Sequence, residues 1–123
     1  MNLSGASVVI TGGAGLIGSH LATRLADDND VLVADDLSKG DRDRLPDDIE
    51  FTQADVTDES DVAEVITEET DIVFHLAALT DTNFDDDRTM FERNTGMTHE
   101  VLDRMREVGV DNLAFTSSST VYG

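Results

Sequence analysis

Glycines near the start of the chain have the spacing of a phosphate-binding turn. In the stretch TGGAGLIGSH, Gly13, Gly15 and Gly18 form the pattern G-x-G-x-x-G, and counting from Gly12 gives G-x-x-G-x-x-G. In such a turn one glycine permits the tight bend from strand to helix. A second lets the backbone approach a pyrophosphate, and a third lets the helix pack close to the strand. Free N–H groups at the helix start then bind the phosphate charge, so the pattern predicts a dinucleotide site.

A carboxylate follows at the distance expected for recognition of a ribose. Asp35 ends the apolar stretch VLVAD, 20 residues after Gly15, and Asp36 repeats the charge. A carboxylate there accepts hydrogen bonds from the adenosine ribose and repels a 2′-phosphate, which favours NAD over NADP. The alternative is that Asp35 is one more surface acid in an acid-rich chain. The Walker sequence GxxxxGK[ST] does not occur, so a P-loop hydrolase is poorly supported.

Alternating strand and helix patterns supply the elements that must position these residues. Short apolar stretches predict strands at 7–11, 30–35, 49–55, 71–78 and 110–118. Apolar residues at helical spacing predict helices at 16–25, 58–70 and 88–109, with one helical turn in the loop 37–46. We therefore expect an α/β fold, a Rossmann-like doubly wound parallel sheet of about five strands in the order 3-2-1-4-5, with helices on both faces.

Four single residues bear on how these elements begin, end and pack. Asp58 or Glu59 suits the positive end of the second helix, and Gly109 suits the end of the third. We expect His75 to face a helix from its strand rather than to bind a metal, because its neighbours offer no metal geometry.

The composition limits the class of protein. The 123 residues amount to one domain, and the absence of cysteine excludes disulfides and cysteine-based zinc sites. No signal peptide or membrane-length apolar stretch is seen, so we expect a cytoplasmic protein. A formal net charge of −19 should repel nucleic acid and anionic membranes. Three explanations remain open: adaptation to high salt in a halophile, mimicry of nucleic acid, and an ordinary acidic protein.

Four blocks in this order carry a resemblance: TGGAGLIGSHL, DV at 55–56, HLAAL at 75–79 and FTSSSTVYG at 115–123. Together they resemble the extended short-chain dehydrogenase/reductase family, and within it the NAD-dependent epimerases and dehydratases of the UDP-glucose 4-epimerase type. The resemblance covers the whole chain but only the N-terminal part of such an enzyme. It implies NAD as cofactor and a nucleotide sugar as the substrate of the full-length enzyme.

The resemblance also implies a role for each site residue. It places Gly12, Gly15, Leu16, Ile17 and Gly18 around the pyrophosphate, Asp35 and Asp36 at the adenosine ribose, Asp55 and Val56 beside the adenine, Leu76, Ala77 and Ala78 along the path to the nicotinamide ribose, and Asn94 at the active-site end. Ser118 matches the catalytic serine, whose hydroxyl would hydrogen-bond the sugar oxygen as hydride leaves the carbon.

The acid–base pair of the family, Tyr-x-x-x-Lys on a helix, is not in this sequence. Its one tyrosine, Tyr122, is followed by a single glycine, and its one lysine is Lys39. We therefore expect residues 1–123 to form an incomplete NAD-binding domain, without the catalytic helix and the substrate domain, that is not competent in catalysis alone. The alternatives are a stand-alone nucleotide-binding module without turnover and a domain that binds nothing tightly. A sheet edge left uncovered would favour a homodimer.

Overall fold

The fold alternates strands with helices along the chain. A computed structural model describes residues 4–14, 16–37, 41–76 and 87–115. Its elements are β1 (Ser7–Thr11), α1 (Leu16–Leu25), β2 (Asp30–Asp35), the short 3-10 helix η1 (Arg42–Arg44), β3 (Glu50–Gln53), α2 (Glu59–Val65), β4 (Ile72–His75), α3 (Asp87–Val108) and β5 (Asn112–Phe115). The helical turn expected after the second strand is confirmed as η1.

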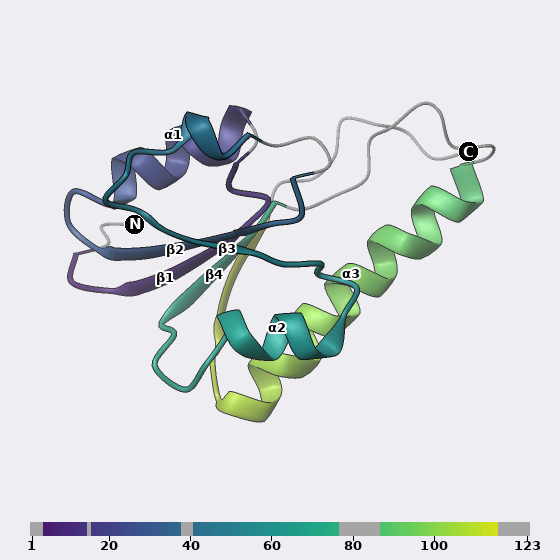
Figure 1. Cartoon of the computed structure of the whole chain (residues 1–123). Helices are drawn as coiled ribbons and strands as arrows, with labels where there is room; N and C mark the ends of the chain where they lie inside the picture. The colour runs from purple at the N-terminus through teal and green to yellow at the C-terminus, as the bar shows by residue number, and fades with distance from the viewer. Residues whose placement is uncertain (1–3, 15, 38–40, 77–86, 116–123) are drawn as a thin grey trace.

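The strands form one parallel sheet in the order β3-β2-β1-β4-β5, which confirms the predicted fold and strand order. The helix α1 lies on one face, and α2 and α3 lie on the other (Figure 1). Near the carboxyl ends of the strands, Ala34 pairs with Thr11, Thr11 with His75, and His75 with Phe115. We call these four residues the terminal row. The residues that follow the terminal row on each strand therefore lie together at one edge of the sheet.

Two apolar clusters hold the layers together. Side chains of a strand alternate between its faces, so Ile10 and Val33 pack with Ala22 of α1, while Val9 and Val73 pack toward α2 and α3. Both faces of the central strands are thus buried. This explains why their sequences are continuously apolar rather than alternating.

The helix α2 begins at Glu59, next to the acidic residues that were expected at its positive end. The Asp58 carboxylate is its N-cap and accepts hydrogen bonds from the backbone N–H groups of Ser60 and Asp61. This satisfies donors that have no partner inside the helix.

The same helix ends earlier than predicted, at Val65 rather than at residue 70. Thr67 and Thr70 form a turn in which the Thr67 N–H donates to Thr70 Oγ1 and the Thr70 N–H donates to the Thr67 carbonyl. Threonine hydroxyls compete with the helix for backbone groups. Arg104 of α3 donates to the carbonyls of Ala63 and Ile66, so the helix end is satisfied without another turn.

Strands β3 and β4 are shorter than their apolar stretches. Ile49 and Ala54 are buried just outside the bounds of β3, and the Ala54 N–H donates to the Asp35 carbonyl of β2 at 3.0 Å. Residues 77 and 78 of the predicted fourth strand, and 116–118 of the fifth, lie outside the described residues. The helix α3 ends as predicted, with Gly109 at a φ of +80°, a conformation that glycine adopts without a Cβ penalty.

Candidate functional site

Residues predicted to bind a dinucleotide follow the terminal row on three neighbouring strands. Gly12 follows the row on β1, Asp35 on β2 and Leu76 on β4. The chain leaves β1 toward β2 on one side and reaches β4 on the other, so the strand order reverses at this point. Open α/β sheets bind ligands in the crevice outside the carboxyl ends of strands at such a reversal.

The glycine-rich loop brings α1 close to β1. Gly12 has a φ of +73°, and its N–H donates to the Ala34 carbonyl at 2.7 Å. A Cβ on Gly18 would stand 2.5 Å from the Gly12 carbonyl oxygen and 2.7 Å from the Gly13 Cα. Contacts this short with backbone atoms leave no room for a side chain. Gly18 therefore fits the predicted role of allowing close packing of helix and strand.

The first turn of α1 follows the glycine-rich loop directly. Ile17, in the first turn of α1, is 70% exposed and directly precedes Gly18. Leu16 begins α1. Gly15 lies outside the described residues.

Asp35 is buried at the end of β2 and is bound to two backbone segments. Its side chain accepts hydrogen bonds from the Ala14 N–H at 3.0 Å through Oδ2 and from the Leu37 N–H at 2.8 Å through Oδ1. With 7% of its surface exposed, it is not a surface acid, which excludes that alternative. A carboxylate has about four acceptor positions, so these bonds leave capacity for ribose hydroxyls. Its neighbour Asp36 is exposed.

The loop also has a contact that the sequence analysis did not predict. The Ala14 carbonyl accepts hydrogen bonds from the Asp41 N–H at 2.9 Å and from Arg44 Nη1 at 3.3 Å, so η1 closes over the outside of the loop. Arg42 lies 5.3 Å from the centre of the Phe51 ring and attaches η1 to β3. The clustering of basic residues was a sequence signal for this contact, because three of the eight basic residues fall within 39–44.

The DV block at 55–56 forms the turn before α2. Asp55 is exposed, and its Oδ1 accepts hydrogen bonds from the backbone N–H and the hydroxyl of Thr57. Val56 belongs to the apolar cluster under α2 and α3 and is 7% exposed. Both residues lie beyond the carboxyl end of β3, on the same edge of the sheet as Asp35.

At the carboxyl edge, His75 of β4 contacts residues of two other elements, β1 and α3. Its Nδ1 lies 2.7 Å from Thr11 Oγ1 of β1, and its Nε2 lies 3.3 Å from Thr98 Oγ1 of α3. Burial lowers the pKa of His75 from 6.5 to about 4, so the ring is neutral at pH 7. The expectation that His75 faces a helix is confirmed. Among the described residues, no group of histidine, aspartate and glutamate side chains could hold a metal ion.

Other predicted site residues are only partly placed. Asn94 lies in α3, four residues before Thr98. Leu76 is half-buried at the end of β4, and its N–H donates to the carbonyl of Thr11 at 2.9 Å. Ala77, Ala78 and Ser118 lie outside the described residues.

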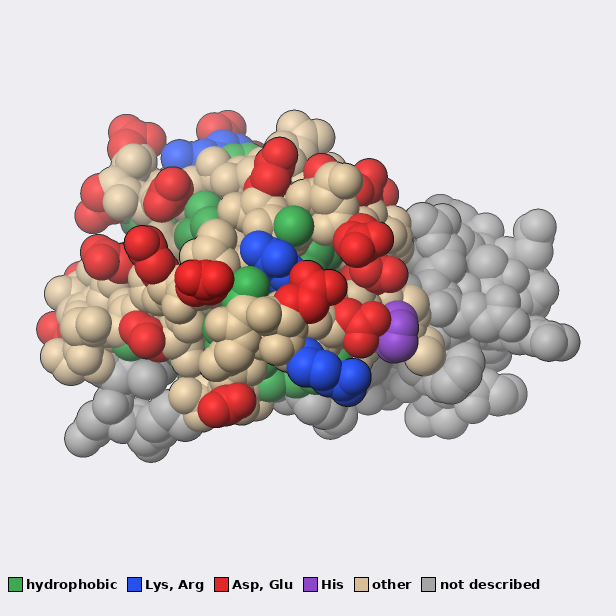
Figure 2. All heavy atoms as spheres, turned by 90° about the horizontal axis from the view of Figure 1, so that it is seen from below, with side chains coloured by type: hydrophobic (Ala, Val, Ile, Leu, Met, Phe, Trp, Pro, Cys, Tyr) green, Lys and Arg blue, Asp and Glu red, His purple; other side chains and the backbone are tan. Residues whose placement is uncertain are grey.

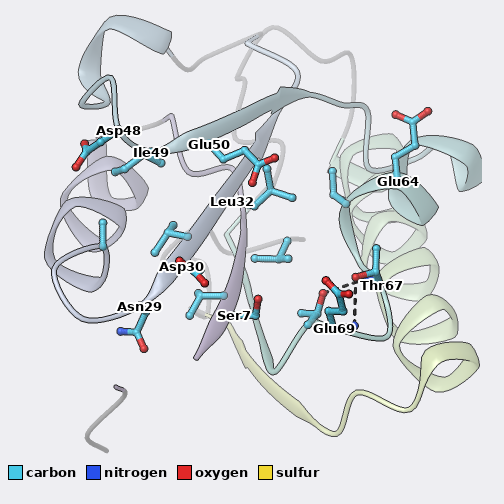
Figure 3. Close-up of a pocket in the computed structure, with 16 residues that line it drawn as sticks. Ser7, Asn29, Asp30, Leu32, Asp48, Ile49, Glu50, Glu64, Thr67 and Glu69 are labelled. Carbon is cyan, nitrogen blue, oxygen red and sulfur yellow. Dashed lines mark hydrogen bonds between the residues drawn. The ribbon is translucent and has the colours of Figure 1, made fainter. Parts of the chain in front are cut away.

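A cavity of about 500 Å³ lies at the opposite edge of the sheet, where the strands begin. Figure 3 shows acidic side chains of its lining, Asp30, Asp48, Glu50, Glu64 and Glu69. These acids would repel the pyrophosphate of a dinucleotide. Size alone therefore does not identify the site, and the chemistry favours the carboxyl edge. No helix in the part of the chain that the structure describes is long and apolar enough to cross a membrane.

Comparison with known proteins assigns this architecture to a family. The family model described as "NAD dependent epimerase/dehydratase family" matches residues 8–123. The chain belongs to this family. It corresponds to the N-terminal, UDP-glucose 4-epimerase-like portion of the family's proteins.

Individual relatives agree with this assignment. The UDP-glucose 4-epimerase of Lacticaseibacillus casei is 32% identical over 121 residues, covering 95% of this chain and 37% of the relative. An epimerase structure from Methanothermobacter thermautotrophicus has a TM-score of 0.85 at 33% identity, covering 94% of this chain and 36% of that one. The UDP-glucose-4-epimerase of Stenotrophomonas maltophila, solved with bound NAD and formylated UDP-arabinopyranose, has a TM-score of 0.81 at 32% identity and covers 96% and 38%. The chain thus spans little more than a third of their lengths.

Proposed function

We propose that this chain binds NAD at the carboxyl edge of its sheet and forms the NAD-binding part of a nucleotide-sugar epimerase or dehydratase. The observation that carries the proposal is the buried Asp35 carboxylate, which accepts the Ala14 N–H of the glycine-rich loop. This hydrogen bond connects the glycine-rich loop, which is proposed to bind the pyrophosphate, to the end of β2, which is proposed to bind the ribose. The Stenotrophomonas relative, similar over 96% of this chain, was solved with NAD bound.

The same geometry supports a preference for NAD over NADP. A 2′-phosphate on the adenosine ribose would place an anion against a buried carboxylate that water cannot screen, with the Asp36 carboxylate beside it. The remaining contacts are proposed as the sequence implied them: the glycine-rich loop with Leu16 and Ile17 at the pyrophosphate, Asp55 and Val56 at the adenine, Leu76, Ala77 and Ala78 toward the nicotinamide ribose, and Asn94 at the active-site end.

Calorimetric titration in high KCl tests the binding site. We expect NAD to bind at least about tenfold more tightly than NADP, which corresponds to about 1.4 kcal/mol. The Gly15→Val variant should lose NAD binding, because a branched side chain would occupy the position of the pyrophosphate. Gly96→Ala is the matched control, since a Cβ at Gly96 meets nothing within 4 Å. Equal affinities for the two cofactors, or normal NAD binding by Gly15→Val, would contradict the proposal.

We propose that the 123-residue chain does not turn over substrate by itself. It lacks the Tyr-x-x-x-Lys pair, and a positioned acid or base typically contributes about 10²–10⁴-fold to the rate. An assay for epimerisation, dehydration and oxidation of UDP-glucose in the presence of NAD should give no product above background. Turnover that a single substitution in this chain abolishes would refute this.

The alternative function is a nucleotide-binding module that acts without the rest of an epimerase. The reading frame beyond codon 123 separates the two functions. A continuation that encodes Tyr-x-x-x-Lys supports the enzyme, and a stop codon supports the module.

The acidic surface supports a further part of the proposal, adaptation to high salt. Acidic side chains are scattered over the coloured part of the face in Figure 2, with only a few basic ones between them. At 0.01 M ionic strength the screening length is about 30 Å, comparable with the size of a small domain, and at 1 M it is about 3 Å. The midpoint of thermal unfolding should therefore rise steeply with KCl. A midpoint independent of salt would remove the argument for a halophilic host.

We also propose that copies of the chain associate at high protein concentration. The strand β5 ends the described sheet and pairs there with β4 alone, so its outer edge offers hydrogen-bonding groups to a second copy. Light scattering in high KCl should show a mass that grows with concentration. A monomer throughout the millimolar range would contradict this.

A further inference from the structure

We propose that His75 is a positioning residue which, with Thr11 and Thr98, fixes the glycine-rich loop, the end of β4 and α3 relative to one another, and so sets the place of the nicotinamide half of the cofactor. The proposal rests on the proposed binding of NAD. His75 stands in the terminal row between Thr11 and Phe115. Its ring nitrogens contact one residue on β1 and one on α3, so a single side chain touches two of the elements around the crevice and belongs to a third.

We propose a direction for these hydrogen bonds. The contact of Thr11 Oγ1 with His75 Nδ1 is 2.7 Å, at the short end of the range for N–H donors, and we assign the hydroxyl as its donor. Thr11 Oγ1 also accepts the Leu76 N–H at 3.2 Å, so this oxygen already acts as an acceptor toward β4. A neutral imidazole has one N–H, so in the arrangement that we propose this proton is on Nε2 and is donated to Thr98 Oγ1. The donors therefore run from Thr11 through His75 to Thr98.

Burial makes this arrangement rigid. His75 and Thr11 are 7% and 1% exposed, and Met97 and Val101 beside Thr98 belong to the apolar cluster. A buried polar group that loses its partner is left without water to replace it. The low pKa of His75, caused by desolvation, keeps the ring neutral, so neither threonine must adapt to a charge. The hydrogen bonds thus favour one arrangement of the three elements over small shifts of α3.

The two halves of the proposed cofactor depend on this arrangement to different degrees. The adenosine half relies on Asp35 and its bond to Ala14, on the other face of the sheet from the His75 ring. The nicotinamide half is proposed to rely on Leu76 and on Asn94. Leu76 follows His75 directly, and Asn94 lies one helical turn before Thr98 in α3. Loss of the Thr98 bond should therefore weaken NAD binding and leave ADP binding intact.

The test compares Thr98→Val with Thr98→Ser and Thr95→Val in the full 123-residue chain in high KCl. Valine keeps the branched shape of threonine and removes the hydroxyl, whereas serine keeps the hydroxyl. Thr95 is exposed on the same helix and is the matched control. Titrations with NAD and with ADP give the two affinities, and nitrogen NMR of the imidazole gives the tautomer of His75.

We expect Thr98→Val to weaken NAD binding by about three- to tenfold, the range of one hydrogen bond, and to leave ADP affinity nearly unchanged where the variant is folded. Its unfolding midpoint should fall, because the buried His75 ring loses a hydrogen-bond partner. Thr98→Ser should retain most of the NAD affinity, Thr95→Val should behave as the parent chain, and the parent should show protonated Nε2. An equal loss for NAD and ADP would mean a general structural role and would overturn the proposal, as would an NAD affinity that Thr98→Val leaves unchanged. If the parent chain binds neither ligand, the proposed function fails. A protonated Nδ1, or Thr98→Val leaving the imidazole signals unchanged, would separately overturn the hydrogen-bond arrangement.

Discussion

The carboxyl and amino edges of the sheet are built from the same five strands. They differ in whether their polar side chains are buried or exposed. Of the five buried polar residues among those that the structure describes, Thr11, Asp35 and His75 lie at the carboxyl edge. Each has hydrogen-bond partners from another segment. The acids at the amino edge, including Asp48 and Glu50, are exposed around an open cavity. Buried polar groups persist where the fold supplies partners, so the carboxyl edge has the fixed geometry that a specific ligand needs.

The largest effect should come from adding one methyl group at the carboxyl edge. In Gly18→Ala the new Cβ would meet the Gly12 carbonyl oxygen at 2.5 Å, and backbone atoms cannot rotate away. We expect a loss of about 3 kcal/mol or more in the free energy of unfolding, together with loss of NAD binding. Chemical denaturation and calorimetry measure the two effects. Gly96→Ala adds the same methyl group to open space on α3 and should raise stability by up to about 1 kcal/mol.

Acidification should act on the same edge through His75. The folded pKa of about 4 lies below the ordinary value of 6.5, so between these pH values the unfolded chain binds more protons than the folded one. Stability therefore falls as the pH is lowered from 6.5 to 4, by on the order of 3 kcal/mol, and is unaffected by this group above pH 6.5. Denaturation across this range should show the slope in the parent chain.

The variants His75→Asn and His20→Asn separate this effect from the titration of the many carboxylates. His75→Asn should lack the part of the slope that the buried ring contributes, and His20→Asn, on the exposed face of α1, should keep it. Identical slopes in all three proteins would show that burial of His75 does not govern the acid response.

A substitution near the amino edge should reduce stability without a specific effect on the cofactor. Arg104 donates to the carbonyls of Ile66 at 2.8 Å and of Ala63 at 3.2 Å, which lie at the end of α2. Arg104→Met should leave these groups unsatisfied and cost about 1–3 kcal/mol. Its control is Arg106→Met at an exposed position of the same helix. NAD affinity should stay within about twofold wherever the variant is folded, and a selective loss of NAD binding would break the contrast between the edges.

The smallest effects should come from the acids around the amino-edge cavity. Asp48→Asn and Glu50→Gln each remove one charge from an exposed, crowded acidic surface. We expect each to raise the free energy of unfolding by no more than about 0.5 kcal/mol in dilute buffer, with no change above 1 M KCl. Asp35→Asn, the same change at the carboxyl edge, should instead weaken NAD binding. Similar outcomes for Asp48 and Asp35 would mean that burial does not distinguish the two edges.

Most of the fold could be predicted from local patterns. The apolar strands, the glycine-rich turn and the start of α2 depend on residues close together in the sequence, and the strands and helices follow one another in the predicted order. The end of α2 was missed because it depends on Arg104, which lies 38 residues beyond Ile66. The spacing of Asp35 from the glycine-rich loop could be read from the sequence. The burial of its carboxylate and its hydrogen bond to Ala14 could not. The contact of Arg44 with Ala14 depends on how η1 folds back, which periodicity does not reveal.

The register of the strands also bears on the order in which the chain folds. The bond from Ala14 to Asp35 spans 21 residues, whereas the contact of Thr11 with His75 spans 64. Closing the longer loop costs about 1 kcal/mol more in chain entropy. During synthesis β2 leaves the ribosome well before β4. We expect the part of the crevice proposed for adenosine to form first, as a βαβ unit around the glycine-rich loop. The part proposed for nicotinamide should be completed only when β4 inserts beside β1.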